Sequence, residues 1–161
     1  MNTKPTTPDL YERLLAFASM LLLLAVLAAL AKGYPTWGQV PWQVWPHLIT
    51  ILIALALTPL MLLRRRGDAT HRLLGRIWVA SMFLTALLSF NVRGINHGGF
   101  SPIHLLSAFT VVMAPLAWWF AYTHRIANHR RAIRGLVTGA LLVAGFFTFP
   151  FNRLLGQWLF G

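Results

Sequence analysis

Long apolar stretches alternate with short polar or basic segments along this chain. Each stretch is about as long as an α-helix that crosses the roughly 30 Å hydrocarbon core of a bilayer. The pattern therefore predicts an all-α integral membrane protein with five transmembrane helices. They are expected at about residues 10–31, 46–63, 71–92, 102–122 and 132–151.

The first apolar stretch follows a polar segment, residues 1–9, which we expect to be a cytoplasmic tail. Small residues around Ala31 resemble a signal-peptide cleavage site, but the apolar run is longer than the core of a typical signal peptide. We therefore interpret residues 10–31 as a retained transmembrane helix. It has no counterpart among the other four helices, so we expect it at the periphery.

The composition indicates that lipid solvates most of the chain. The 161 residues are 57% hydrophobic and include 3 acidic residues against 14 Lys and Arg. A soluble domain of this length could not bury so much apolar surface. The basic residues gather at the ends of the apolar stretches and form no continuous stripe, so nucleic acid is not an expected partner.

Two basic segments orient the chain in the membrane. Residues 64–76 hold the first and residues 124–134 hold the second. Lys and Arg resist translocation, which places both segments in the cytoplasm. We expect a multi-pass protein of the bacterial inner membrane with a cytoplasmic N-terminus and a periplasmic C-terminus. The Trp-rich loop over residues 32–45 is typical of the outer interface.

The residue types that the chain lacks exclude several classes of cofactor and ion site. The chain has no cysteine, which excludes disulfides, thiolate metal sites, iron–sulfur clusters and covalently attached c-type haem. No acidic residue follows Asp68, so ion coupling through a carboxylate buried in a span is not expected. A cofactor would therefore bind through His, Met, Tyr, Asn or the backbone.

The last four apolar stretches form an internal repeat over residues 46–94 and 102–153. Each copy starts with a proline and a histidine, holds one proline within its first helix, crosses a basic loop with a His-Arg pair and ends in Phe-Asn. Parallel repeats pack about a pseudo-twofold axis along the membrane normal. We therefore expect one four-helix bundle over residues 46–153, with residues 154–161 as an amphipathic outer tail.

This repeat brings four histidines into two facing pairs. His47 is expected to face His104 near the outer surface, and His71 to face His129 near the inner surface. Two imidazoles on facing helices supply the two axial nitrogens of a six-coordinate b-type haem. The pattern therefore predicts that the four histidines ligate the iron of two haems b.

Arginines near both pairs suit the anionic propionates of haem. Arg72, Arg76, Arg130 and Arg134 surround the inner pair, and Arg93 and Arg153 flank the outer pair. Two further histidines have no partner in the repeat. We interpret His97 as a surface or substrate-side residue and His124 as a fallback ligand for the inner iron.

The order of these histidines along the chain resembles the transmembrane dihaem cytochrome b proteins, in which the second helix pairs with the fourth and the third with the fifth. The resemblance implies electron transfer across or within the membrane, between a donor on one side and an acceptor on the other. It also implies quinone or a redox protein as a partner, and leaves open whether the chain is itself a membrane oxidoreductase.

A second resemblance is carried by local motifs. They are His71-Arg72-Leu73-Leu74-Gly75-Arg76, His129-Arg130-Arg131-Ala132-Ile133-Arg134-Gly135 and Ser101-Pro102-Ile103-His104-Leu105. These motifs resemble a bacterial family of integral membrane proteins that carries a domain of unknown function, over about residues 46–161. The resemblance implies functional positions at His71, His104 and His129 but no activity.

Other interpretations of the same residues are open. Histidine and arginine at the ends of membrane helices are common as interfacial residues and topology signals. One alternative is quinone or another redox ligand bound without haem, and another is metal-ion handling by the histidine pairs. A third is a non-redox accessory protein that binds lipid or a partner.

Overall fold

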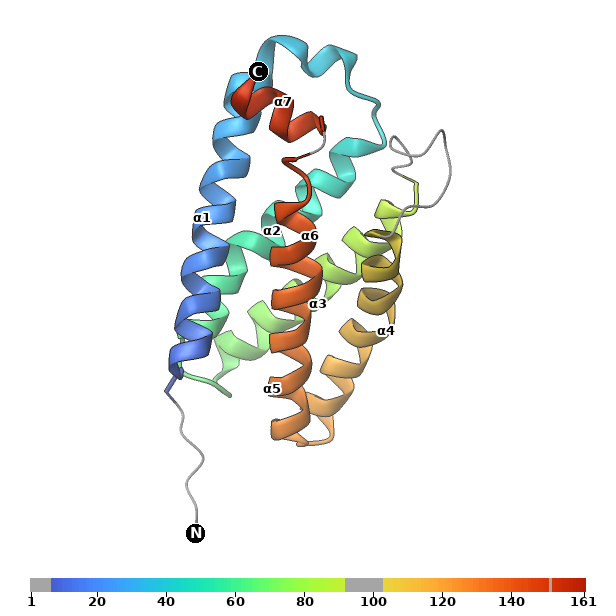
Figure 1. The fold of residues 1–161 in the computed structure, drawn as a ribbon. Coiled ribbons are helices and arrows are strands. Elements are labelled where there is room, and N and C mark those ends of the chain that lie inside the picture. The colour runs from blue at the N-terminus through green and yellow to red at the C-terminus, as the bar shows by residue number, and fades with distance from the viewer. Residues whose placement is uncertain (1–6, 92–102, 151) are drawn as a thin grey trace.

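The computed structural model describes residues 7–91, 103–150 and 152–161, and every regular element in these ranges is a helix (Figure 1). The second and third long helices are tilted relative to the other long helices, and the first helix begins at the end of the molecule opposite to the last helix. The elements are α1 (Leu10–Gly33), η1 (Tyr34–Gln39), α2 (Val44–Leu63), α3 (Ala69–Ser89), α4 (Ile103–Tyr122), α5 (Ile126–Gly135), η2 (Leu136–Val143), α6 (Ala144–Phe146) and α7 (Leu154–Phe160).

Four helices are long and apolar enough to cross a membrane. Within the described residues they cover Leu10–Gln39, Val44–Leu63, Ala69–Ser89 and His104–Tyr122. These helices confirm the first four predicted stretches as apolar helices of spanning length. They present large apolar side chains to the outside, as expected of helices that contact lipid.

The fifth predicted span, residues 132–151, has a different character. Helical residues run without interruption from Ile126 to Phe146, through α5, η2 and α6. The run begins with the polar and basic α5, and η2 is a π-helical segment with widened turns. It is not among the four apolar helices of spanning length, so the fifth span stays a prediction.

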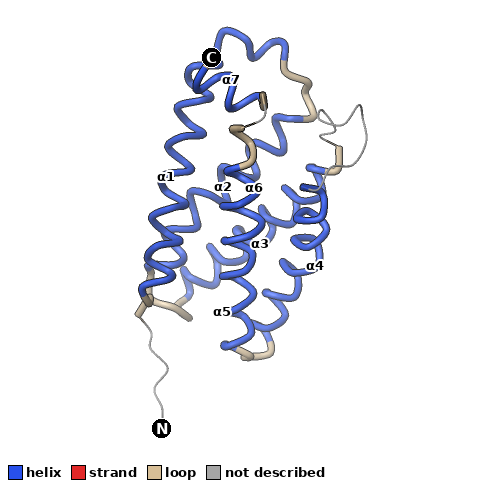
Figure 2. Tube along the Cα trace, in the orientation of Figure 1, coloured by secondary structure: helices blue, strands red, loops and turns tan. Residues whose placement is uncertain are grey.

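The helices pack as a bundle in which neighbours along the chain are also neighbours in space (Figure 2). α2 packs against α1 and α3, and α4 packs against α3, α5 and η2. α1 also contacts η2 and α7. The first helix therefore bridges the two predicted hairpins, a contact that the repeat does not predict.

The first turn of α1 holds a buried carboxylate. Asp9 caps the helix, and the Asp9 and Glu12 side chains accept reciprocal backbone hydrogen bonds in a capping box. The hydrogen bond from the Glu12 backbone N–H lowers the pKa of Asp9, burial opposes this effect, and the Arg134 guanidinium reinforces it. The Glu12 side chain is only 2% exposed, so its charge needs partners.

Arginines from both basic segments supply these partners. The Nε of Arg130 lies 2.6 Å from Glu12 Oε1, and a guanidinium nitrogen of Arg134 lies 3.2 Å from the same oxygen. Arg66 pairs with the other carboxylate oxygen of Glu12. Arg130 and Arg134 also pair with Asp9. This group, Asp9, Glu12, Arg66, Arg130 and Arg134, is called the ion cluster below.

We predict that Glu12→Gln weakens the fold. Gln keeps the size of the side chain and an oxygen that can accept hydrogen bonds, but the three arginines lose their buried negative charge. Loss of one partner from a buried ion pair is strongly destabilising, and we expect a decrease of about 2–3 kcal/mol in the free energy of unfolding. Denaturant unfolding of the detergent-solubilised protein, followed by circular dichroism, measures it.

Asp68→Asn is the matched control. Asp68 pairs with Arg64 at an exposed position and caps α3 through the His71 backbone N–H. Asn keeps the cap and removes the same single charge, so this variant should unfold like the parent protein. Equal destabilisation by both substitutions would contradict a special role for Glu12.

Candidate functional site

A cavity of about 640 Å³ lies at the end of the bundle where α2 and α4 begin. Its volume falls within the range of about 300–1,000 Å³ that is typical of cofactor and ligand sites. Apolar residues from α1, α2, α3 and η2 form most of the wall. The polar lining includes Gln43, His47, Thr85, His104, Thr110 and Arg153.

His47 is held in position by the neighbouring helix. Its ring Nδ1 lies 3.1 Å from the backbone carbonyl oxygen of Thr85 on α3. A carbonyl accepts only, so Nδ1 carries the proton and donates, and Nε2 keeps its lone pair. Such a bond is the usual way in which proteins orient a histidine that ligates a metal.

His104 lies on the first turn of α4 and lines the same cavity. The residue is 7% exposed, and the centroid of its ring lies 5.9 Å from that of Phe90. The structure therefore brings the two histidines of the predicted outer pair to one cavity.

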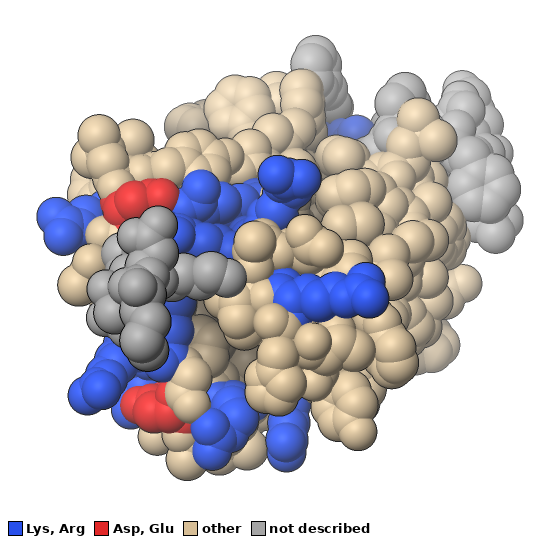
Figure 3. All heavy atoms as spheres, turned by 90° about the horizontal axis from the view of Figure 1, so that it is seen from below, with Lys and Arg blue, Asp and Glu red and all other residues tan. Residues whose placement is uncertain are grey.

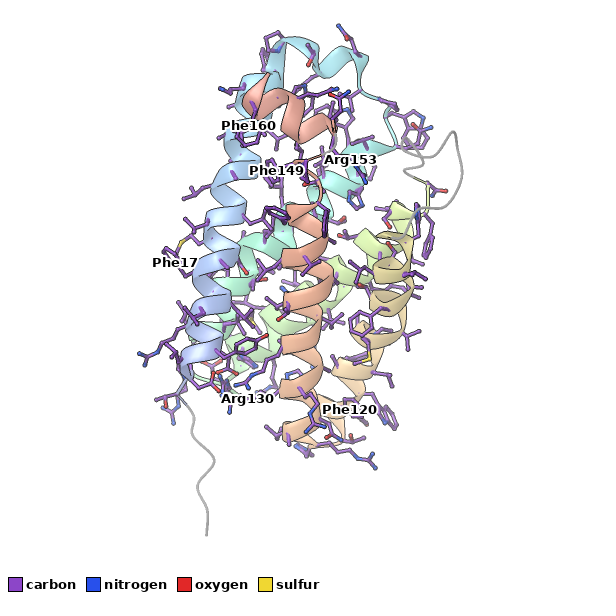
Figure 4. All side chains as sticks on the ribbon, in the orientation of Figure 1. Phe17, Phe120, Arg130, Phe149, Arg153 and Phe160 are labelled. Carbon is purple, nitrogen blue, oxygen red and sulfur yellow. The ribbon has the colours of Figure 1, made fainter. Side chains whose placement is uncertain are left out.

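Arg153 adds positive charge to the cavity. It precedes α7, at the point where the chain turns into that helix (Figure 4). Its Nε is buried and has no hydrogen-bond partner in the described part of the chain. Burial lowers the pKa of this guanidinium because it removes water from the charged group, and an anion in the cavity would stabilise the charge and accept the Nε–H hydrogen bond. Arg93, predicted to flank the outer pair, and His97, predicted as a surface or substrate-side residue, lie outside the described residues.

The C-terminal helix α7 closes one side of the cavity through Leu154 and Leu155. Trp158 fixes this helix against α1 and η1, because its indole Nε1 donates to Thr36 Oγ1 at 2.8 Å. A Cβ on Gly33 would lie 2.1 Å from the Trp158 ring, so only glycine permits this contact. The sequence predicts residues 154–161 only as an amphipathic outer tail, and it does not predict that they cover a cavity.

The inner pair also comes together. His71 lies in the first turn of α3 and His129 in the first turn of α5, and their imidazoles are close enough to interact electrostatically. His129 Nδ1 lies 2.8 Å from the backbone carbonyl oxygen of Ala117 on α4, which leaves Nε2 as the acceptor. His71 Nδ1 is buried and makes no hydrogen bond within the described residues.

The arginines predicted around the inner pair have several different partners. Arg130 and Arg134 belong to the ion cluster and bind Asp9 and Glu12. Arg72 donates to the Gly67 carbonyl oxygen at 2.6 Å, and both Arg72 and Arg76 are exposed. Glu12 is not among the predicted site residues, although an acidic residue at the edge of an apolar stretch is a signal for such a role.

His124, the fallback inner ligand, has a different setting. It lies exposed in the turn between α4 and α5, where its φ of 56° places it in the left-handed region. That backbone conformation is unusual for a residue other than glycine, and Asn tolerates it well.

Comparison with protein-family models finds no match for this chain, and comparisons with curated proteins and with solved structures find no significant match. The resemblances that the sequence motifs carry therefore stay predictions, and the site is interpreted from its own geometry.

We predict that Trp158→Ala loosens α7 and opens the cavity. The natural chain has no cysteine, so a thiol introduced by Ala144→Cys in the cavity wall reports access to water-soluble thiol reagents. Without the indole, α7 loses its hydrogen bond to Thr36 and its packing on Gly33, and labelling should become several-fold faster. Trp42→Ala is the control, because Trp42 is 73% exposed and does not line the cavity. Unchanged labelling in the Trp158 variant would show that α7 does not control access.

Proposed function

We propose that this protein is a b-type dihaem cytochrome of the bacterial inner membrane, in which a helical bundle carries electrons across or within the bilayer. The observation that carries the proposal is the cavity that His47 and His104 share, with the buried Arg153 Nε beside it. The proposal includes a fifth span through α5, η2 and α6, a cytoplasmic N-terminus and a periplasmic C-terminus.

The donor set fits a bis-histidine haem. The outer cavity has room for a cofactor-sized ligand and presents an imidazole from each of two helices. His47 is already oriented through Nδ1, which leaves Nε2 as the ligating atom. Arg153 is suited to hold a propionate through the Nε–H that has no other hydrogen-bond partner in the described residues.

The inner histidine pair offers the same kinds of ligand as the outer pair, two imidazoles with arginines nearby. His129 is oriented through Nδ1 by the Ala117 carbonyl, and His71 lies close to it. Arg72 and Arg76 are not engaged by carboxylates, so they are the favoured propionate partners on this side. Arg130 and Arg134 already pair with Asp9 and Glu12, so a propionate would have to compete with these carboxylates for the two arginines.

A bound b-type haem supplies reversible one-electron chemistry. The protein would set the redox potential of the haem and the access of water to it. Apolar residues of α1, α2, α3 and η2 exclude water from the outer site, and α7 covers it. Quinone or a redox protein would exchange electrons with the site, in the direction that their relative potentials determine.

Absorption spectroscopy of the purified protein tests the proposal. Expression with a sufficient haem supply should yield a red protein with a Soret band and sharp α bands after reduction. A folded but colourless protein would overturn the proposal and favour the rival interpretation, a non-redox membrane protein that binds lipid, a partner or a metal ion through the same residues.

Histidine variants should lose haem in pairs. We expect that His47→Ala and His104→Ala each remove the outer haem, and that His71→Ala and His129→Ala each remove the inner one, so every variant keeps about half of the haem per protein. Pyridine haemochrome assays measure the content. His124→Asn is the control and should keep both haems, because Asn accepts the left-handed backbone at this position. A different pairing would contradict the layered arrangement.

A further inference from the structure

One end of the molecule concentrates both signs of charge (Figure 3). The first turn of α1, the loop between α2 and α3, and the turn between α4 and α5 meet there. All three acidic residues of the chain lie at this end, Asp9 and Glu12 at the start of α1 and Asp68 at the start of α3. The arginines at this end are Arg13, Arg64, Arg65, Arg66, Arg72, Arg76, Arg125, Arg130, Arg131 and Arg134.

These arginines divide into two groups by their partners. Arg64 pairs with Asp68, and Arg66, Arg130 and Arg134 pair with Glu12 or Asp9. The salt bridges of the described residues include none of the other arginines at this end. Among these, Arg13, Arg65, Arg125 and Arg131 are exposed and have no role in the proposed haem sites. They are called the unpaired arginines below.

We propose that the unpaired arginines bind the phosphate groups of anionic phospholipids in the adjacent leaflet. A guanidinium matches a phosphate in both charge and geometry, because its planar fork donates two parallel hydrogen bonds. Asp9 and Glu12 offset two of the three arginine charges of the ion cluster, and the unpaired arginines add further positive charge at exposed positions. The lipid phosphates would neutralise the arginine charge that the three acidic residues leave unbalanced.

The surroundings of these arginines favour a lipid over another polyanion. Large apolar side chains lie next to them along the chain, including Leu14 beside Arg13 and Ile126 beside Arg125, which are 57% and 45% exposed. Trp118, Trp119 and Tyr122, near the end of α4, are 56%, 54% and 73% exposed, as in the aromatic belt of an interface. RNA would leave this apolar surface in water, whereas lipid covers it and places phosphates at the ends of the helices.

Native mass spectrometry of the full-length protein in detergent tests the proposal. Phosphatidylglycerol and phosphatidylethanolamine with identical acyl chains serve as probes. We expect tighter binding of phosphatidylglycerol, and a decrease of this preference as salt screens the charges. Each arginine near an anionic lipid surface contributes about fivefold in affinity, so the double variant R125Q/R131Q should lower the phosphatidylglycerol affinity by about 25-fold.

R64Q/D68N is the matched control at the same end of the molecule. It also changes two side chains but removes a pair whose charges already cancel, so phosphatidylglycerol binding should not change. Circular dichroism and the unfolding temperature verify that both variants fold. These readouts do not depend on haem, so the lipid proposal and the cytochrome proposal can fail separately.

Four results would overturn the lipid proposal. The first is equal binding of the two lipids by the natural protein, and the second is an unchanged lipid preference in R125Q/R131Q. The third is displacement of phosphatidylglycerol by millimolar inorganic phosphate, which would indicate a site for soluble anions. The fourth is tighter binding of single-stranded RNA than of nanodiscs that contain phosphatidylglycerol at physiological salt.

Discussion

The buried carboxylate of Glu12 is the constraint on which the arrangement of the helices depends. A charge that is 2% exposed is costly unless opposite charges surround it, and Arg66, Arg130 and Arg134 meet that need. Arg66 comes from the loop between α2 and α3, and Arg130 and Arg134 come from α5, so the ion pairs of one carboxylate join three distant segments. The first helix is thereby held against α2 on one side and η2 on the other.

The helices were largely predictable because their lengths follow from the thickness of a bilayer. An apolar stretch bounded by proline, glycine and basic residues specifies a spanning helix without reference to distant parts of the chain. The π-helical turns of η2 could not be predicted in this way. They belong to a run of helical residues, 126–146, that starts six residues before the predicted span and whose contacts with α1 are long-range.

The sequence predicts which histidines come together in the site, but it does not predict which charged groups lie beside them. The repeat predicted the His47–His104 pair from spacing alone, and both residues line one cavity. The position of Arg153 depends on how α7 docks, and that docking requires Trp158 to lie directly on Gly33. The pairing of Arg130 with Glu12 joins residues 118 positions apart, so no local pattern contains it.

The cavity also shows why the repeat alone is an incomplete description of the site. The run from η2 into α6 contributes small residues, Ala140, Ala144 and Gly145, to the wall. A Cβ on Gly145 would lie 2.5 Å from a methyl carbon of Leu22 on α1, so α1 packs closely on this wall. Asp68 is the one acidic residue within the predicted repeat and it pairs with Arg64, whereas the carboxylates that α5 pairs with come from Glu12 of α1 and its cap Asp9. Leu22 and Val26 of α1 also line the cavity, so the helix outside the predicted repeat supports the site.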